Sequence, residues 1–166
     1  MFVEMKVSGL TIDPLTNTPI VILKDLEGKR AVPIWIGLFE ASAIATELEK
    51  ISFSRPMTHD LLREMVKILD GKVIKIEIID LKNNTFFALI HLMKDGNVVT
   101  IDSRPSDAIA LALRVNAPIY IAEQVIEKSR SIDFVKKGEE LDKLKKEDLE
   151  DFLENLSDED FGKYKM

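Results

Sequence analysis

The chain of 166 residues contains no cysteine, one tryptophan and two histidines. Without cysteine it can form neither a disulfide bond nor a thiolate zinc site. No apolar run approaches the roughly 18–20 residues that cross a membrane, and no signal segment with a basic start and an apolar core is visible. We therefore expect a cytoplasmic protein that makes no use of a membrane.

The sequence also lacks the motifs of the well-marked enzyme classes: the Walker loop, G-x-G-x-x-G, H-E-x-x-H and G-x-S-x-G. It has no excess of basic residues either. The net charge is −6, and residues 139–160 carry 11 acidic side chains against 3 lysines, whereas residues 1–138 hold 18 residues of each sign. A protein that holds nucleic acid mainly by counterion release would be basic, so this balance argues against tight nucleic-acid binding.

Two similar series of strands, each followed by a helix, are predicted along the chain. Apolar or alternating runs between turn signals predict strands at 2–10, 20–26, 31–36, 73–79, 86–93, 98–101 and 119–121. An alignment without gaps pairs Ile36 with Ile101 and the segment 43–45 with 108–110, which indicates an internal duplication, although two amphipathic units can also look alike by chance. The expected fold class is α+β, with duplicated strand–hairpin–helix units on a mostly antiparallel sheet system and a C-terminal helical tail.

Three further helices are predicted, near 58–69, near 123–130 and in the acidic tail. The first is expected to pack into the core through one face, formed by Leu61, Leu62, Met65, Ile68 and Leu69. In the tail, apolar positions between Leu141 and Leu156 could line one side of a helix. We therefore divide the chain into a domain at 1–135 and an acidic helical tail at 136–166. The tail's apolar stripe and the apolar strands favour a homo-oligomer, most simply a dimer.

The run from Asn97 to Arg114, NVVTIDSRPSDAIALALR, is the first place to look for a functional site. Val98–Ile101 is expected to be a short buried strand, and Ala108–Leu113 a helix that is apolar on nearly all sides. Pro105 fixes its own φ and disfavours helical geometry at Arg104, so the helix should begin at Pro105. Two carboxylates, two hydroxyls and a guanidinium therefore crowd the junction of strand and helix.

The polar residues at this junction, Asp102, Arg104, Ser106 and Asp107, have two interpretations. They can be structural, as loop hydrogen bonds, an ion pair and a helix cap. An arginine beside free helix N–H groups also suits a phosphate, and two carboxylates suit Mg²⁺ or Mn²⁺. Spacing alone favours the structural interpretation.

The two histidines occupy different positions. His91 lies inside a predicted strand, where we expect a hydrogen-bonded structural histidine. His59 lies at the start of a predicted helix, where it could act as acid, base or metal ligand near pH 7. The position alone favours the other interpretation of His59, a surface or capping role.

Several motifs in order along the chain resemble those of the bifunctional nuclease domain family. They are Pro33-Ile34-Trp35-Ile36-Gly37 with Glu40-Ala41, Arg55-Pro56 with Thr58-His59-Asp60-Leu61-Leu62, Phe86 with Ala88, and the run Asp102–Ala112 with Pro118-Ile119. The resemblance covers roughly residues 3–130, and its specific part is R-P-S-D-A-I-A. It implies an α+β domain and a nuclease acting on both DNA and RNA. It assigns no catalytic residues.

Two hypotheses about function follow. In the first the protein is a nuclease, and its candidate residues are Arg104, Ser106 and Arg55 for the phosphate, Asp102, Asp107 and Glu40 for a Mg²⁺ or Mn²⁺ ion, and His59, with Asp102, Arg104 and Asp107, for catalysis. In the second it is a non-catalytic module that binds a small anionic ligand or a partner protein through the segment Asp102–Asp107. An activity assay on single-stranded and duplex substrates distinguishes the two.

Overall fold

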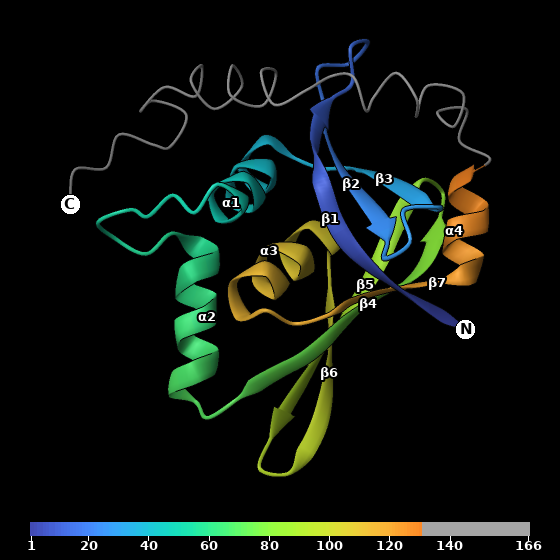
Figure 1. Ribbon diagram of the computed structural model, residues 1–166. Helices are drawn as coiled ribbons and strands as arrows, with labels where there is room; N and C mark the ends of the chain where they lie inside the picture. Colours follow the sequence, from blue (N-terminus) through green and yellow to red (C-terminus); the bar gives the residue numbers. More distant parts are fainter. Residues whose placement is uncertain (131–166) are drawn as a thin grey trace. The chain divides into compact units, whose positions relative to one another are not determined.

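The structure is a computed structural model, and it describes residues 1–130. Within these residues seven strands form one sheet, accompanied by four helices (Figure 1). In chain order the elements are β1 (Phe2–Ile12), β2 (Pro19–Asp25), β3 (Ala31–Trp35), α1 (Leu38–Leu48), α2 (Thr58–Ile68), β4 (Lys72–Lys82), β5 (Thr85–Lys94), β6 (Asn97–Ser103), α3 (Pro105–Val115), β7 (Ile119–Ala122) and α4 (Glu123–Arg130). The predicted tail at 136–166 lies outside the described residues.

The sheet is built from two antiparallel three-stranded meanders. The strand order is β3-β2-β1-β7-β4-β5-β6, so β7 joins the two meanders, antiparallel to β1 and parallel to β4. Each meander leads into a helix, α1 or α3, and these two helices pack against each other. The α+β class, with duplicated units on a mostly antiparallel sheet, is therefore confirmed.

The two units correspond as arrangements of elements rather than residue by residue. Ile36 is buried, whereas Ile101, its predicted counterpart, is 43% exposed. The helix of the first unit begins two positions after Ile36, while the helix of the second begins four positions after Ile101. An alignment without gaps cannot follow this difference in spacing between strand and helix.

Short hairpins set the register of the second meander. Asn83 and Asn84 have φ of 49° and 58°, and Asp95 and Gly96 have φ of 50° and 75°. Both central residues of each turn are thus left-handed, the geometry whose twist matches that of the flanking antiparallel strands. Asparagine, aspartate and glycine tolerate that geometry better than other residues.

Helix α3 is the central helix of the domain. It packs on β4 and β5 and buries eight of its 11 residues, namely Pro105, Ser106, Ala108, Ile109, Ala110, Leu111, Ala112 and Arg114. Arg104 has an extended backbone (φ −71°, ψ 143°) and caps the helix, and Pro105 is its first residue. The predicted buried helix and its start are confirmed.

Strand β6 is not buried, which corrects the prediction for 98–101. Its apolar residues Val98, Val99 and Ile101 are 51%, 50% and 43% exposed. The reason is its place in the sheet, because β6 lies at one end of the strand order and pairs only with β5 among the described strands. A short apolar run is typical of a central strand and of an unprotected edge strand alike.

A second prediction, that the apolar face of α2 packs into the core, is wrong. The helix has an apolar face, but none of its residues is buried, and Leu61, Met65, Ile68 and Leu69 just after its end are 51–75% exposed. Periodicity identifies the apolar face of a helix without saying what covers it. Asp60 completes the N-terminal cap, since its carboxylate accepts a hydrogen bond from the N–H of Met57 at 3.0 Å.

His91 is a hydrogen-bonded structural histidine, as predicted. Its Nε2 lies 2.7 Å from Oε2 of the buried Glu77 in the neighbouring strand β4. Lys75 reaches the other oxygen of Glu77.

Among the described helices none is long and apolar enough to span a membrane.

Candidate functional site

The first turns of α1, α2 and α3 meet at a cluster that we call the N-terminal network. It consists of Glu40 from α1, His59 from α2, Asp107 from α3, and Arg104, which caps α3. All four were predicted from the sequence, and the structure brings them together from three separate segments. Carboxylates at Glu40 and Asp107 also lie where the positive end of a helix dipole favours them.

Arg104 is the centre of the N-terminal network. Its Nε donates to Oδ2 of Asp107 at 2.7 Å, and one terminal nitrogen lies 2.7 Å from Oε1 of Glu40. The side chain is nevertheless 66% exposed. A guanidinium has five N–H donors, so most of them remain available on the solvent side for an incoming anion.

His59 contacts the other oxygen of the same aspartate. Its Nε2 lies 2.9 Å from Oδ1 of Asp107, and only 12% of the histidine side chain is exposed. Nδ1 makes no hydrogen bond within residues 1–130. Asp107 therefore orients both a cation that faces solvent and an imidazole whose second nitrogen is unused, which is the relation between a general base and its orienting carboxylate.

Asp107 is ionised in this setting. Burial raises the pKa of its carboxyl, but the hydrogen bonds from Arg104 and His59 outweigh burial, and the net pKa lies below its usual value. The same carboxylate, with Glu40, raises the pKa of the Arg104 guanidinium. Because an ionised carboxylate can only accept hydrogen bonds, Nε2 of His59 is the nitrogen that donates to Asp107, and in the neutral imidazole Nδ1 is then the nitrogen with the lone pair.

Gly37 makes room for the carboxylate of Glu40. A Cβ at position 37 would collide with the Glu40 carboxylate, which folds back over the start of α1. The backbone of Gly37 is extended (φ −75°, ψ 162°), so glycine is needed here for space rather than for an unusual φ. The predicted motif of Gly37 and Glu40 thus has a steric basis.

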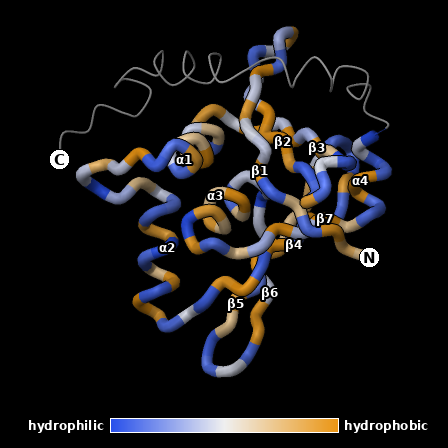
Figure 2. The backbone as a smooth tube through the Cα atoms, viewed as in Figure 1, coloured by the Kyte–Doolittle hydropathy of each residue, from blue (hydrophilic) through white to orange (hydrophobic). Residues whose placement is uncertain are grey.

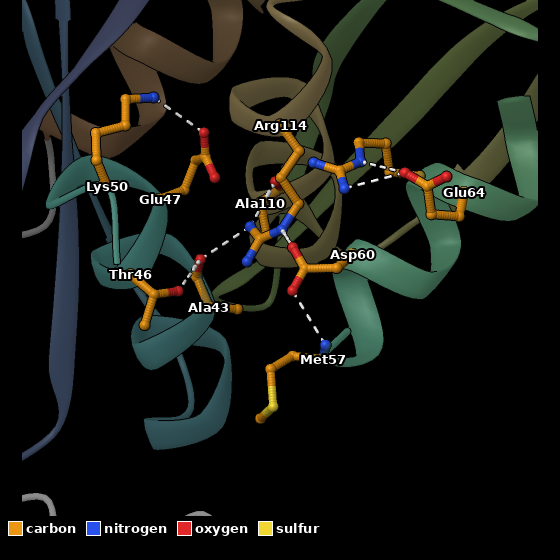
Figure 3. A network of polar contacts seen from close by, with 10 residues as sticks. Ala43, Thr46, Glu47, Lys50, Met57, Asp60, Glu64, Ala110 and Arg114 are labelled. Atoms are coloured by element: carbon orange, nitrogen blue, oxygen red, sulfur yellow. Dashed lines mark hydrogen bonds and ion pairs between the residues drawn. The ribbon is translucent and has the colours of Figure 1, made fainter. Parts of the chain in front are cut away.

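A second polar cluster, which we call the Arg114 clamp, was missed by the sequence analysis (Figure 3). Nε of Arg114 donates to Oδ1 of Asp60 at 2.7 Å, and one terminal nitrogen donates to the carbonyl oxygens of Ala43 and Ala110, each at 2.9 Å. The arginine side chain is only 2% exposed. The clamp therefore ties α1, α2 and α3 together one residue away from His59.

The clamp also affects the ionisation of Asp60. Burial raises the pKa of this carboxyl, but the hydrogen bonds from Arg114 and from the N–H of Met57 lower it more, so the net pKa is below its usual value. One signal was present in the sequence, since Arg114 is the one charged residue in the otherwise apolar stretch 108–115. Its partner is 54 positions away, which no local pattern reveals.

Three predicted residues do not join the N-terminal network. Asp102 lies opposite Leu89, while its neighbour Ile101 lies opposite the buried Ile90, so Asp102 points to the face of the sheet that α3 does not cover. Neither the Asp102 carboxylate nor the Arg55 guanidinium has a hydrogen bond or ion pair to another residue in the range 1–130. Ser106 is buried in the first turn of α3.

The residues at the site do not form a ready metal site. Within the described part of the chain, no group of three or more histidine, aspartate or glutamate side chains is placed to hold a metal ion. Glu40 and Asp107 are both paired with Arg104, and Asp102 points elsewhere. We therefore derive no chemical step through Mg²⁺ or Mn²⁺.

Comparison with known proteins identifies the family. The model of the bifunctional nuclease domain matches residues 21–133. The chain belongs to the bifunctional nuclease domain family. An uncharacterised protein of Mycobacterium tuberculosis is 36% identical over 162 residues, which cover 95% of this chain and 97% of that protein.

Plant members of the family are more distant. Bifunctional nuclease 1 of Arabidopsis thaliana is 28% identical over 107 residues, and bifunctional nuclease 2 of Oryza sativa subsp. japonica is 25% identical over 117 residues. These alignments cover 62% and 68% of this chain but only 33% and 36% of the plant proteins. The similarity to them is therefore a similarity of the domain.

Proposed function

We propose that this protein is a nuclease that hydrolyses phosphodiester bonds in DNA and RNA, with the N-terminal network as its active site. The proposal is supported by membership of the bifunctional nuclease domain family and by one observation in particular. A solvent-facing arginine and a histidine with an unused nitrogen share one carboxylate, Asp107. That is the minimum set for binding a phosphate and activating a water beside it.

Arg104 binds the scissile phosphate in this mechanism. Its free N–H groups face solvent, and the N–H groups of the first turn of α3 lie next to it, so an anionic oxygen finds donors from both. Negative charge grows on the phosphoryl oxygens in the transition state, and Arg104 stabilises it. Glu40 holds the guanidinium from the other side.

His59 acts as the general base. Its Nδ1 takes a proton from a water molecule as the water oxygen forms a bond to phosphorus, and the bond to the sugar oxygen breaks with that oxygen keeping the electron pair and taking up a proton from solvent water. Asp107 holds the imidazole in the required tautomer and stabilises the positive charge that His59 acquires. Because residues 1–138 carry no net charge, we expect few phosphate contacts and a shallow dependence of binding on salt.

The test is cleavage of single-stranded and duplex DNA and RNA by the purified full chain, with Mg²⁺, with Mn²⁺ and with a chelator. We expect Arg104→Ala to lose about 10- to 100-fold in kcat/KM, the value of one charge-assisted contact. His59→Gln should lose about 10²- to 10⁴-fold in kcat. Arg63→Ala, which removes an exposed arginine of α2 outside the network, serves as the control.

The melting temperature separates catalysis from folding. Because the Arg104 side chain is largely exposed, its loss should cost at most about 1 kcal/mol of stability. A wild-type protein that cuts none of the substrates, or a His59→Gln variant with full activity, would contradict the proposal.

The non-catalytic alternative keeps one observation in its favour. Arg104 is far more exposed than His59, so a small anion can reach the arginine without reaching the imidazole. Under this alternative, inorganic phosphate binds the wild type and His59→Gln equally, Arg104→Ala abolishes binding, and no variant cleaves a phosphodiester.

A further inference from the structure

The two edges of the sheet are protected very differently. At one edge, β3 contains Pro33, and α4 packs on this strand. Proline and a covering helix are two of the usual ways to stop an edge strand from pairing with another chain. At the other edge, β6 has no proline, its register with β5 shows no bulge, and its one charged residue is Asp102. Unprotected apolar edges of this kind pair with further strands.

Helix α2 has an exposed apolar face as well. Leu61, Met65 and Ile68, with Leu69 just past the helix end, fall on one face of the helix, and we call these four residues the α2 stripe. Figure 2 shows hydrophobic positions along both α2 and β6.

The C-terminal end of α2 lies close to β5, the neighbour of β6. A Cβ at Gly71, just after α2, would touch both Val66 of the helix and Leu92 of β5, and Leu92 lies opposite Val99 of β6. Ile101 lies opposite the buried Ile90. Val99 and Ile101 therefore point to the same side of the sheet as α2.

We propose that β6 and the α2 stripe together form a surface that binds a second copy of the chain, with β6 of each copy pairing antiparallel across a two-fold axis. A two-fold interface brings a patch against itself, so a patch with charge of one sign would repel its copy. Here the strand carries a single charge and the α2 stripe carries none. The patch is thus self-complementary in its chemistry.

The sequence of β6 favours one register, centred on Thr100. In that register Val99 of each copy faces Ile101 of the partner subunit on the helix side, and the two threonines face each other. Pairs of β-branched side chains and of threonines both stabilise antiparallel strands. The two Asp102 carboxylates are kept apart, since each lies opposite Val98 of the partner subunit.

Light scattering of the full chain tests the proposal. We expect a mass of twice 18.8 kDa at micromolar concentration. Val99→Lys places a charge on the edge strand, and Ile68→Lys places one on the α2 stripe; each should reduce the mass to that of one chain. The matched control is Leu15→Lys, because Leu15 is 86% exposed outside this surface and its replacement should leave the dimer intact.

Circular dichroism shows whether each lysine variant is folded, and two variants on separate elements guard against one that is not. The absence of native cysteine permits a direct second test. Thr100→Cys should form an intermolecular disulfide on oxidation, whereas Leu15→Cys should not. A wild-type mass of one chain or of three, or a dimer that both lysine variants leave unchanged, would overturn the proposal.

Discussion

Helices α2 and α3 are equal in length and each supplies one half of the pair formed by His59 and Asp107, yet they are held in different ways. Helix α3 buries eight residues beneath the other elements, and α2 buries none. The N-terminal end of α2 is instead held by polar contacts, from Asp60 to Arg114 and from His59 to Asp107. One side of the candidate site is thus fixed by the core, and the other depends on a few charged groups.

The largest expected effect comes from breaking the Arg114 clamp. Arg114→Met removes a buried cation and leaves the Asp60 carboxylate without its partner, which should cost about 3–5 kcal/mol in the free energy of unfolding. Hydrogen exchange should accelerate more in α2 than in α3, because α2 has no buried residues to hold it.

The matched control for this variant is Lys50→Met. It removes an exposed ion pair with Glu47 and should change stability by less than about 0.5 kcal/mol. If Arg114→Met costs no more than Lys50→Met, or if α2 and α3 open together in hydrogen exchange, then α2 is not held by polar contacts.

This comparison also explains what the sequence could and could not predict. The start of α3 follows from Pro105 alone, and the left-handed turns follow from Asn83-Asn84 and Asp95-Gly96, because each depends on a residue and its immediate neighbours. For α2 and β6, periodicity identified the apolar positions correctly but assigned them to the core. Whether a face is covered depends on elements far away in the sequence.

The candidate site divides in the same way. His59, Arg104 and Asp107 were found as residue types at the starts of helices, where local rules apply, and Glu40 was found through a motif that resembles the family. Asp102 was included because it is near in sequence, but alternation along β6 points it to the other face of the sheet. The Arg114 clamp joins three helices through tertiary contacts, and no local rule predicts its partners.

Acid should weaken the polar contacts that hold α2 before it weakens the apolar packing that holds α3. Asp60 and Asp107 have pKa values lowered by folding, so each contributes stability that is fully present above its unfolded pKa of about 3.8. That contribution is lost as the pH falls from there through the lower folded pKa. We therefore expect the free energy of unfolding to decrease below about pH 4.

Two variants sharpen this expectation. Asp60→Asn and Asp107→Asn should each be less stable than the wild type at pH 7 and should approach it in acid, because the wild type loses there what the variants already lack. The measurement is urea denaturation at several pH values. A constant difference between wild type and variant over the whole range would show that these carboxylates do not hold α2.

A much smaller effect on stability than that of Arg114→Met should come from Gly37→Ala, which acts on the N-terminal network rather than on either helix. The new Cβ occupies the place of the Glu40 carboxylate, so that carboxylate must swing away and Arg104 loses one of its two partners. Position 37 keeps an extended backbone that alanine adopts without strain, and the displaced group is the mobile end of a side chain, so we expect a loss of about 1 kcal/mol or less. The arginine should then retain its contact with Asp107 but become less well oriented. Phosphodiester cleavage by the Gly37→Ala variant should fall to a similar extent as cleavage by the Glu40→Gln variant. The melting temperature of Gly37→Ala should stay near that of the wild type. A Gly37→Ala variant that cleaves like the wild type while Glu40→Gln does not would show that Glu40 keeps its place over the alanine, and that the glycine is not what positions it.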